Sequence, residues 1–211
     1  MDNTLFLILD APVIGEVHKS SIKIDEELCS KCKQRKLEFT DLSIVVDSWG
    51  GEDYFIIFNM HFITERLKIA FQEKGIKGVE YEEVKVQTGD YFEFREGAYQ
   101  KEMPRVYKLI YKNELKTTDL WWDKLEDCSN CGRSRWEMNE MSLFATSRPS
   151  LNGGKDDENP PLRRVNKKDW KGEDMFTLND PDKTPIITKK FLDIVLEIHS
   201  KEFFVRPTSW I

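Results

Sequence analysis

The sequence predicts an α+β fold made of two related strand–helix–strand lobes. Short apolar runs rich in β-branched and aromatic residues, such as Leu42–Val46 and Tyr54–Phe58, predict strands. Two amphipathic segments, which begin at Ile63-Thr64 and at Ile187-Thr188, predict helices. Each of these segments follows an apolar run and precedes another, which gives the strand–helix–strand order.

Helix signals mark both amphipathic segments. Thr64 suits the N-cap of the first helix, and Glu65 lies in the first turn, where the helix dipole favours an acidic residue. Gly75 suits the position after the helix end. Thr188 is the N-cap expected for the second helix. Further strands are expected at Leu5–Leu9, Val79–Val84, Tyr91–Phe94, Arg105–Tyr111 and Phe203–Pro207.

An internal repeat relates the two helical segments. One ungapped offset aligns Ile63-Thr64 with Ile187-Thr188, and it also aligns Phe71 with Val195, Val79 with Phe203 and Tyr81 with Val205. We interpret residues 1–211 as a single domain with possible internal lobes over 1–112 and 113–211. Chance resemblance between two strand–helix–strand units is the alternative. Residues 147–169 are rich in Pro, Gly, Asn and Asp, and predict a long exposed loop.

Composition sets the class of protein and its location. The 211 residues carry 32 Lys and Arg against 38 Asp and Glu, a formal net charge of −6. No apolar run approaches the ~18 residues of a spanning helix, and the N-terminus lacks the basic and small-residue features of a signal peptide. We expect a cytoplasmic protein without membrane contact. An acidic chain suits a basic protein partner better than a nucleic acid.

The four cysteines form two C-x-x-C pairs, Cys29 with Cys32 and Cys128 with Cys131. In a reducing compartment, two such pairs are best explained by one tetrahedral zinc ion held by four thiolates. A closed shell leaves no position for water, so the zinc is expected to be structural. The pairs lie far apart in the chain, so the ion would join distant segments and thus the two lobes. Four unrelated cysteines and a redox pair are the alternatives.

Basic residues surround both pairs, at Lys31, Lys33, Arg35, Lys36, Arg133 and Arg135. They could offset the −2 charge of a four-thiolate zinc site, or they could be solvated loop charges. The sequence contains no glycine-rich phosphate loop and no nucleophile–base motif. We therefore expect no enzymatic activity.

The cysteine motifs and the C-terminal third resemble the double-CXXCG-motif immunity proteins of bacterial polymorphic toxin systems. The resemblance rests on two C-x-x-C motifs about a hundred residues apart, on Gly75–Val79, on Cys128–Arg133, and on an ending with Asp174, Phe176 and Pro185–Thr188. In the first motif Lys33 replaces the glycine, which puts the local turn in doubt but not the thiolates.

This resemblance implies a cytosolic immunity protein that binds and neutralises a cognate toxin domain by occlusion. Acidic segments are the expected partner contacts, at Glu80, Glu82, Glu83, Asp156, Asp157 and Glu158. The alternative function is a zinc-ribbon-containing nucleic-acid-binding or regulatory module, in which the basic residues near the cysteines form the contact patch. The net negative charge argues against that alternative.

Overall fold

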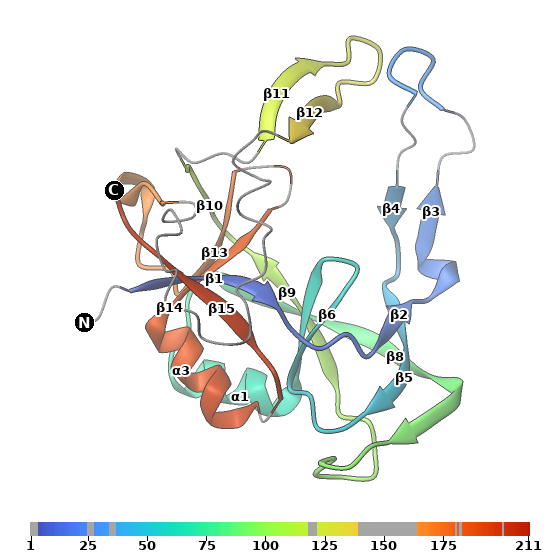
Figure 1. The fold of residues 1–211 in the computed structure, drawn as a ribbon. Coiled ribbons are helices and arrows are strands. Elements are labelled where there is room, and N and C mark those ends of the chain that lie inside the picture. The colour runs from blue at the N-terminus through green and yellow to red at the C-terminus, as the bar shows by residue number, and fades with distance from the viewer. Residues whose placement is uncertain are drawn as a thin grey trace, which may run out of the picture.

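The protein has a mixed α+β fold in which strands dominate (Figure 1). The computed structural model describes residues 4–24, 28–33, 37–117, 122–138, 164–179, 181, 183–199 and 201–211. None of the helices in these residues is long and apolar enough to span a bilayer. The strands are β1 (Leu5–Asp10), β2 (Gly15–Val17), β3 (Ile22–Ile24), β4 (Leu37–Phe39), β5 (Ser43–Trp49), β6 (Tyr54–Ile57), β7 (Met60–Thr64), β8 (Val79–Phe94), β9 (Val106–Tyr111), β10 (Glu114–Leu115), β11 (Trp122–Asp127), β12 (Ser134–Met138), β13 (Met175–Leu178), β14 (Pro185–Thr188) and β15 (Phe204–Thr208); the helices are α1 (Glu65–Glu73) and α3 (Lys189–Ile198), and η1 (Lys19–Ser21) and η2 (Lys167–Asp169) are 3-10 turns.

Two large sheets form the body of the molecule. One has the order β10-β13-β14-β1-β15, and the other has the order β2-β5-β8-β9-β7-β6. β8 is a single 16-residue strand rather than the two strands expected at Val79–Val84 and Tyr91–Phe94. Its first part pairs with β9 and its later part with β5, so residues 85–88, between the two predicted strands, are also held in a ladder.

The two helices lie side by side beneath the sheets and share one apolar core (Figure 1). The Phe71 ring of α1 lies 4.5 Å from the Phe191 ring of α3, between centroids. Both rings are fully buried, and Tyr54 of β6 joins them in the same cluster. Burial of aromatic area of this size is the main force that holds the helices against the sheets.

The segments β6–β7–α1–β8 and β13–β14–α3–β15 have the same strand order. In the first, β9 lies between β7 and β8; in the second, β1 lies between β14 and β15. The registers also correspond, since Thr64 pairs with Val106 where Thr188 pairs with Leu5. Because β1 comes from the N-terminus, the sheet around the second segment includes a strand from outside residues 113–211. The division into lobes at residue 112 stays a prediction.

A seven-residue motif, W-x-G-E-D-x-F, opens both segments, at Trp49–Phe55 and at Trp170–Phe176. In each copy the indole N–H of the Trp donates to the backbone carbonyl of the Glu, at 3.3 Å for Trp49 and 2.9 Å for Trp170. The Glu carboxylate in turn accepts from the backbone N–H that follows the Trp. The third residue of each motif, Gly51 or Gly172, has a φ value of 93° or 91°, which favours glycine at both positions.

The Asp of each motif fixes the start of the helix in its segment. The hydroxyl of Thr64 donates to the Asp53 carboxylate, and the hydroxyl of Thr188 donates to the Asp174 carboxylate at 3.0 Å. Thr188 also caps α3 by accepting from a backbone N–H, whereas the Thr64 side chain makes no cap bond. Thr64 is therefore the N-cap residue by position, but its hydroxyl binds Asp53 instead of capping the helix.

A basic side chain in each helix joins its Asp to the end of the other helix. Arg66 of α1 binds Asp53 and donates to the carbonyl of Ile198, at the end of α3, at 2.9 Å. Lys190 of α3 lies 3.4 Å from Asp174 and donates to the carbonyl of Gly75, after α1, at 2.8 Å. The helices are therefore antiparallel. The cation near the start of each helix binds a backbone carbonyl at the C-terminal end of the other, where the last carbonyls have no partner within the helix.

The loop predicted over 147–169 lies outside the described residues as far as 163. Its last six residues contain η2 and the fully buried Val165, which bridges to Thr117 and Trp210. Trp170 and Trp210 pack nearby, with ring centroids 4.9 Å apart. At this end of the predicted loop Val165 is therefore packed into the core beside the five-stranded sheet, while η2 itself stays exposed.

Two buried histidines are held neutral. Burial lowers the pKa of His61 to about 4, and its Nδ1 lies 2.7 Å from the hydroxyl of the fully buried Tyr54. The Nδ1 of His199 accepts from the backbone N–H groups of Asp53 and Tyr54, at 3.1 Å and 3.3 Å. Burial also lowers the pKa of His199.

We expect this burial to make the fold sensitive to acid. Below the ordinary histidine pKa, His61 binds a proton in the unfolded chain but not in the folded one. The free energy of unfolding therefore decreases as the pH is lowered from about 6.5 to about 4, and it changes little below that. For His61 the loss is roughly 3 kcal/mol. Urea unfolding at several pH values checks this, and His61→Gln should flatten the profile. An equally steep profile in the variant would contradict it.

The two Asp residues should respond alike to substitution. Asp53→Asn and Asp174→Asn each weaken a buried bond to a threonine and an ion pair to the neighbouring helix, so each should lower the free energy of unfolding by about 1–3 kcal/mol. Asp53→Asn should cost more, because its carboxylate is fully buried while that of Asp174 is 11% exposed. Urea midpoints measure both, with Asp193→Asn, at an exposed pair on α3, as the control.

Candidate metal centre

The four cysteines lie on two hairpin arms that project from the body. β3 and β4 flank the first pair, and β11 and β12 flank the second; each hairpin is a two-stranded sheet separate from the large ones. The tips of the two arms meet away from the body (Figure 1). Residues far apart in the sequence are thereby brought together at one point.

The Sγ atoms of Cys29, Cys32, Cys128 and Cys131 all lie within 4.8 Å of one another. Across the arms, Cys29 lies 3.8 Å from Cys128, and Cys32 lies 3.6 Å from Cys131. A tetrahedral ion with metal–sulfur bonds of ~2.3 Å requires sulfur–sulfur distances of about 3.8 Å. The four predicted ligands therefore form a cluster that could hold a metal ion.

Each pair sits on the same kind of tight turn. The backbone N–H of Lys33 donates to the Cys29 carbonyl at 2.9 Å, and that of Gly132 donates to the Cys128 carbonyl at 2.7 Å. Lys33 and Gly132 occupy equivalent positions, with φ values of 59° and 70°. Lys33 therefore keeps the turn that a glycine would favour, at a conformational cost of about 1–2 kcal/mol.

Polar side chains from each turn bind the opposite arm. Lys31 donates to the hydroxyl of Ser129 at 2.8 Å. Asn130 donates from Nδ2 to the Cys29 sulfur and to the Ser30 hydroxyl, both at 3.4 Å. The residues between the cysteines thus help to align the arms, in addition to the thiols themselves.

Hydrogen bonds to sulfur prepare part of the cluster for a metal. The Asn130 side chain and the backbone N–H groups of Cys32 and Lys31 lower the pKa of Cys29 to about 5. Backbone N–H groups of Cys131 and Asn130 lower the pKa of Cys128. At Cys131 a backbone N–H also favours the thiolate, but desolvation and the neighbouring thiols outweigh it and raise the pKa to about 11. A cation must displace the protons that remain, so metal affinity should fall in acid.

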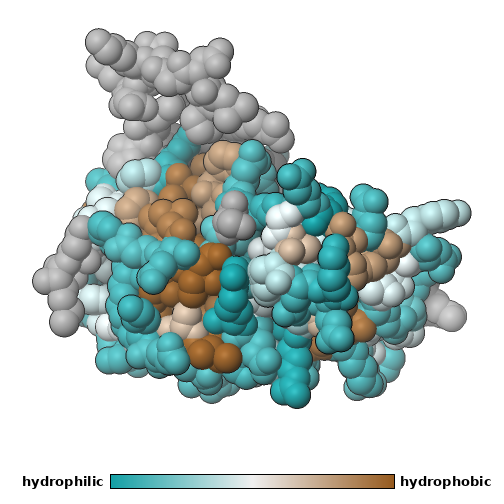
Figure 2. All heavy atoms as spheres, turned by 90° about the horizontal axis from the view of Figure 1, so that it is seen from below, coloured by the Kyte–Doolittle hydropathy of each residue, from teal (hydrophilic) through white to brown (hydrophobic). Residues whose placement is uncertain are grey.

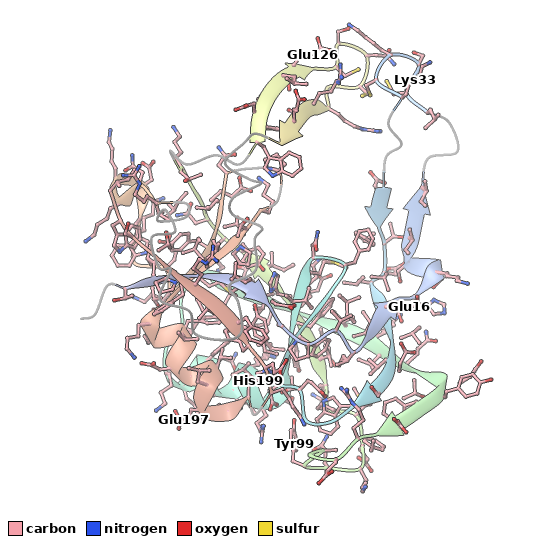
Figure 3. All side chains as sticks on the ribbon, viewed as in Figure 1. Glu16, Lys33, Tyr99, Glu126, Glu197 and His199 are labelled. Carbon is pink, nitrogen blue, oxygen red and sulfur yellow. The ribbon has the colours of Figure 1, made fainter. Side chains whose placement is uncertain are left out.

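The basic residues predicted near the cysteines divide into two groups. Lys31, Lys33, Arg133 and Arg135 lie in the arms, and Figure 3 labels Lys33 and Glu126 at their tips. Arg135 forms an ion pair with Glu126 at 3.1 Å. Arg35 and Lys36 lie outside the described residues. The arms therefore carry charges of both signs.

Three of the acidic residues predicted to contact a partner lie in the body rather than in the arms. Glu80, Glu82 and Glu83 are exposed on β8, in the body. Lys112 lies 2.7 Å from Glu80, and Lys108 lies 3.9 Å from Glu82, so both of these carboxylates have a cation nearby. Asp156, Asp157 and Glu158 lie outside the described residues.

A second polar cluster, which was not predicted from the sequence, surrounds the first W-x-G-E-D-x-F motif. It joins Glu52 and Asp53 to Arg95 and Arg66, and the Tyr99 hydroxyl also donates to Asp53 at 3.0 Å. The signal was present as the repeated motif, which starts 121 residues apart in its two copies. The helical segments repeat 124 residues apart, so an ungapped comparison cannot align both.

The chain matches no protein-family model, no curated protein and no solved structure. The interpretation of the metal centre therefore rests on its own geometry.

We expect Asn130→Ala to weaken the metal centre without removing a ligand. It loses the bond to the Cys29 sulfur and the contact with Ser30, so metal affinity should fall by 10-fold or more. Competition with a chromophoric chelator measures the affinity. Cys128→Ser removes a ligand and should abolish stoichiometric binding, while Asn113→Ala, in the body, should leave affinity unchanged. Wild-type affinity in Asn130→Ala would show that the cross-arm bond does not support the centre.

Proposed function

We propose that this chain is a cytosolic immunity protein that binds and neutralises a cognate bacterial toxin domain, and that it uses a structural zinc ion to join its two arms. The observation that carries the proposal is the gathering of both C-x-x-C pairs into one four-sulfur cluster. This cluster is the element on which the family resemblance chiefly rests. A binding protein of this kind acts by covering a surface and needs no chemistry of its own.

Zinc is the metal that this ligand set favours. Four thiolates in tetrahedral geometry suit Zn²⁺. Its filled d shell imposes no preferred coordination geometry, so the ion accepts a tetrahedral set of ligands. A four-thiolate shell leaves no open position, so the ion would hold structure rather than activate water. Two-stranded hairpins are marginally stable alone, and a shared ion would stabilise both arms at once.

The two segments also support an origin by duplication. They share the strand order, the register and the W-x-G-E-D-x-F motif. At the start of each helix they also share the contacts of the Asp with a threonine hydroxyl and with a basic side chain. We propose that they are related lobes in this sense, with β1 completing the second. Matched hydrogen bonds at matched positions are harder to explain by chance than a shared topology.

A nucleic-acid-binding or regulatory module remains the second candidate. Lys31, Lys33, Arg133 and Arg135 near the metal centre favour it, because a basic patch on a zinc-held hairpin suits phosphate contacts. The pairing of Arg135 with Glu126 and the net charge of −6 weigh against it. Binding to DNA or RNA with a steep salt dependence would support this module instead.

We expect the purified protein to contain one zinc per chain and to protect cells from one toxin. Elemental analysis with thiol counting should find one zinc and four protected thiols. Co-expression with the toxin domain encoded beside this chain should restore growth, and the purified pair should associate at nanomolar or tighter Kd without turnover. Zinc in the protein with no protection from that toxin would contradict the immunity function but not the metal centre.

A further inference from the structure

The four thiols of the metal centre lie close enough to react with one another as well as with a metal ion. Sulfur–sulfur contacts join Cys29 to Cys128 at 3.8 Å and Cys32 to Cys131 at 3.6 Å. Both contacts cross from one arm to the other. A disulfide bond has a sulfur–sulfur distance of ~2.0 Å, so each pair must close by less than ~2 Å.

Bonds between the arm tips hold the two turns in register without the help of a metal ion. Lys31 donates to Ser129 at 2.8 Å, and Asn130 donates to Ser30 at 3.4 Å. Each of these four residues lies between the two cysteines of its own arm. Because these bonds involve no thiol, they keep the same sulfurs opposite each other in the metal-free protein.

Thiol oxidation is confined to the arms and can reach them from solvent. The chain has four cysteines, and all of them belong to this cluster. Cys131 is exposed, Cys29 and Cys32 are half-buried, and Cys128 is buried. The face of the body that Figure 2 shows from below lies away from the arm tips and carries no cysteine. A small oxidant therefore meets thiols only at the tips.

Disulfides within each turn are the competing products. All four sulfurs lie within 4.8 Å of one another, so the two cysteines of one C-x-x-C turn are also within reach. Bonds between the arms are favoured because the short contacts cross the arms, and because Lys31 and Asn130 oppose separation of the tips. Disulfides within the turns would leave only polar contacts between the arms.

We propose that hydrogen peroxide converts the metal centre into two disulfides between the arms, Cys29–Cys128 and Cys32–Cys131, and so releases the metal ion. In each pair one thiolate attacks a peroxide oxygen, the O–O bond breaks, and a sulfenic acid and a hydroxide form. The second thiolate attacks the sulfenic sulfur, the S–O bond breaks, and a second hydroxide leaves. Each disulfide thus costs its two sulfurs two electrons, which one peroxide accepts, and solvent protons convert the hydroxides to water.

The ion and the disulfides are then alternative links between the same two arms. Once both pairs are oxidised, no thiolate remains to bind a divalent cation, so the ion leaves with its charge unchanged. The arms stay joined, whereas removal of the ion by a chelator leaves only polar contacts between them. A dithiol reductant reverses the step by exchange. This inference rests on the proposed metal centre and not on the toxin.

Peptide mapping of the full-length protein tests the pairing. The zinc-loaded protein, with the metal-free protein in parallel, is treated with hydrogen peroxide, its remaining thiols are blocked, and it is digested with trypsin without reduction. Trypsin cuts after Lys31, between Cys29 and Cys32, but leaves Cys128 and Cys131 in one peptide. Disulfides between the arms therefore link three peptides into one species. A chromophoric chelator should record the release of one zinc per chain as the four thiols disappear.

Two double variants separate the possible pairings between the arms. Cys32→Ser with Cys131→Ser keeps Cys29 and Cys128, whose sulfurs lie 3.8 Å apart. Cys29→Ser with Cys131→Ser keeps Cys32 and Cys128, and it is the matched control because it also loses one cysteine from each arm. The first variant should form its disulfide at least threefold faster than the control at the same peroxide concentration. Equal rates would overturn the assigned pairing.

The remaining outcomes separate this inference from the proposed function. Two peptide species, each from one arm, would show that the disulfides form within the turns and would overturn the proposal. Four free thiols and retained zinc after peroxide treatment would also overturn it. If the reduced protein binds no zinc, the proposed metal centre is wrong, and the map of the metal-free protein still decides the disulfides. Protection from a toxin is measured separately, so its failure does not alter the result of the map.

Discussion

The body of this protein depends on satisfying two buried carboxylates, Asp53 and Asp174. Each lies just before a strand hairpin and collects a threonine hydroxyl at the start of a helix and a cation from that helix. An unpaired buried carboxylate would cost several kcal/mol, so the hairpin, the helix start and the cation must form together. Because each cation also reaches the end of the opposite helix, the two segments are fixed relative to one another.

The arms follow a different rule. Neither hairpin belongs to a large sheet, and the strand β11 is mostly exposed. Their alignment comes from four thiols and from cross-arm bonds made by Lys31 and Asn130. A small two-stranded hairpin buries too little apolar surface to be stable by itself. The body is thus stabilised by burial and buried charge, whereas the arms are aligned by polar contacts between their tips and could be joined by a metal ion.

The difference between the body and the arms explains which features could be predicted from the sequence. The cysteine pairs are a local pattern with one dominant chemical meaning, so their convergence was predictable, although the arms that carry them were not. The helix ends could be predicted from Thr64, Thr188 and Gly75, because capping depends on residues that are close in the sequence. The placement of β1 beside β14 was hidden, because it joins the chain's first strand to its last segment. A turn three residues longer in the second hairpin also hid the repeated W-x-G-E-D-x-F motif from an ungapped comparison.

The repeat also shows which contacts the two copies of the motif share and which they do not. Where the two copies agree, as in Trp49 and Trp170 or Asp53 and Asp174, the shared bonds account for the residues. Where they differ, the burial of the motif differs too: Glu52 is buried and pairs with Arg95, whereas Glu173 is half-buried and accepts from the Asn113 amide. Tyr99, whose hydroxyl donates to Asp53, belongs to the first copy and lies at the end of the molecule opposite the labelled residues of the arms (Figure 3). A metal ion held between the arms would therefore affect that end of the molecule only through the stability of the whole chain.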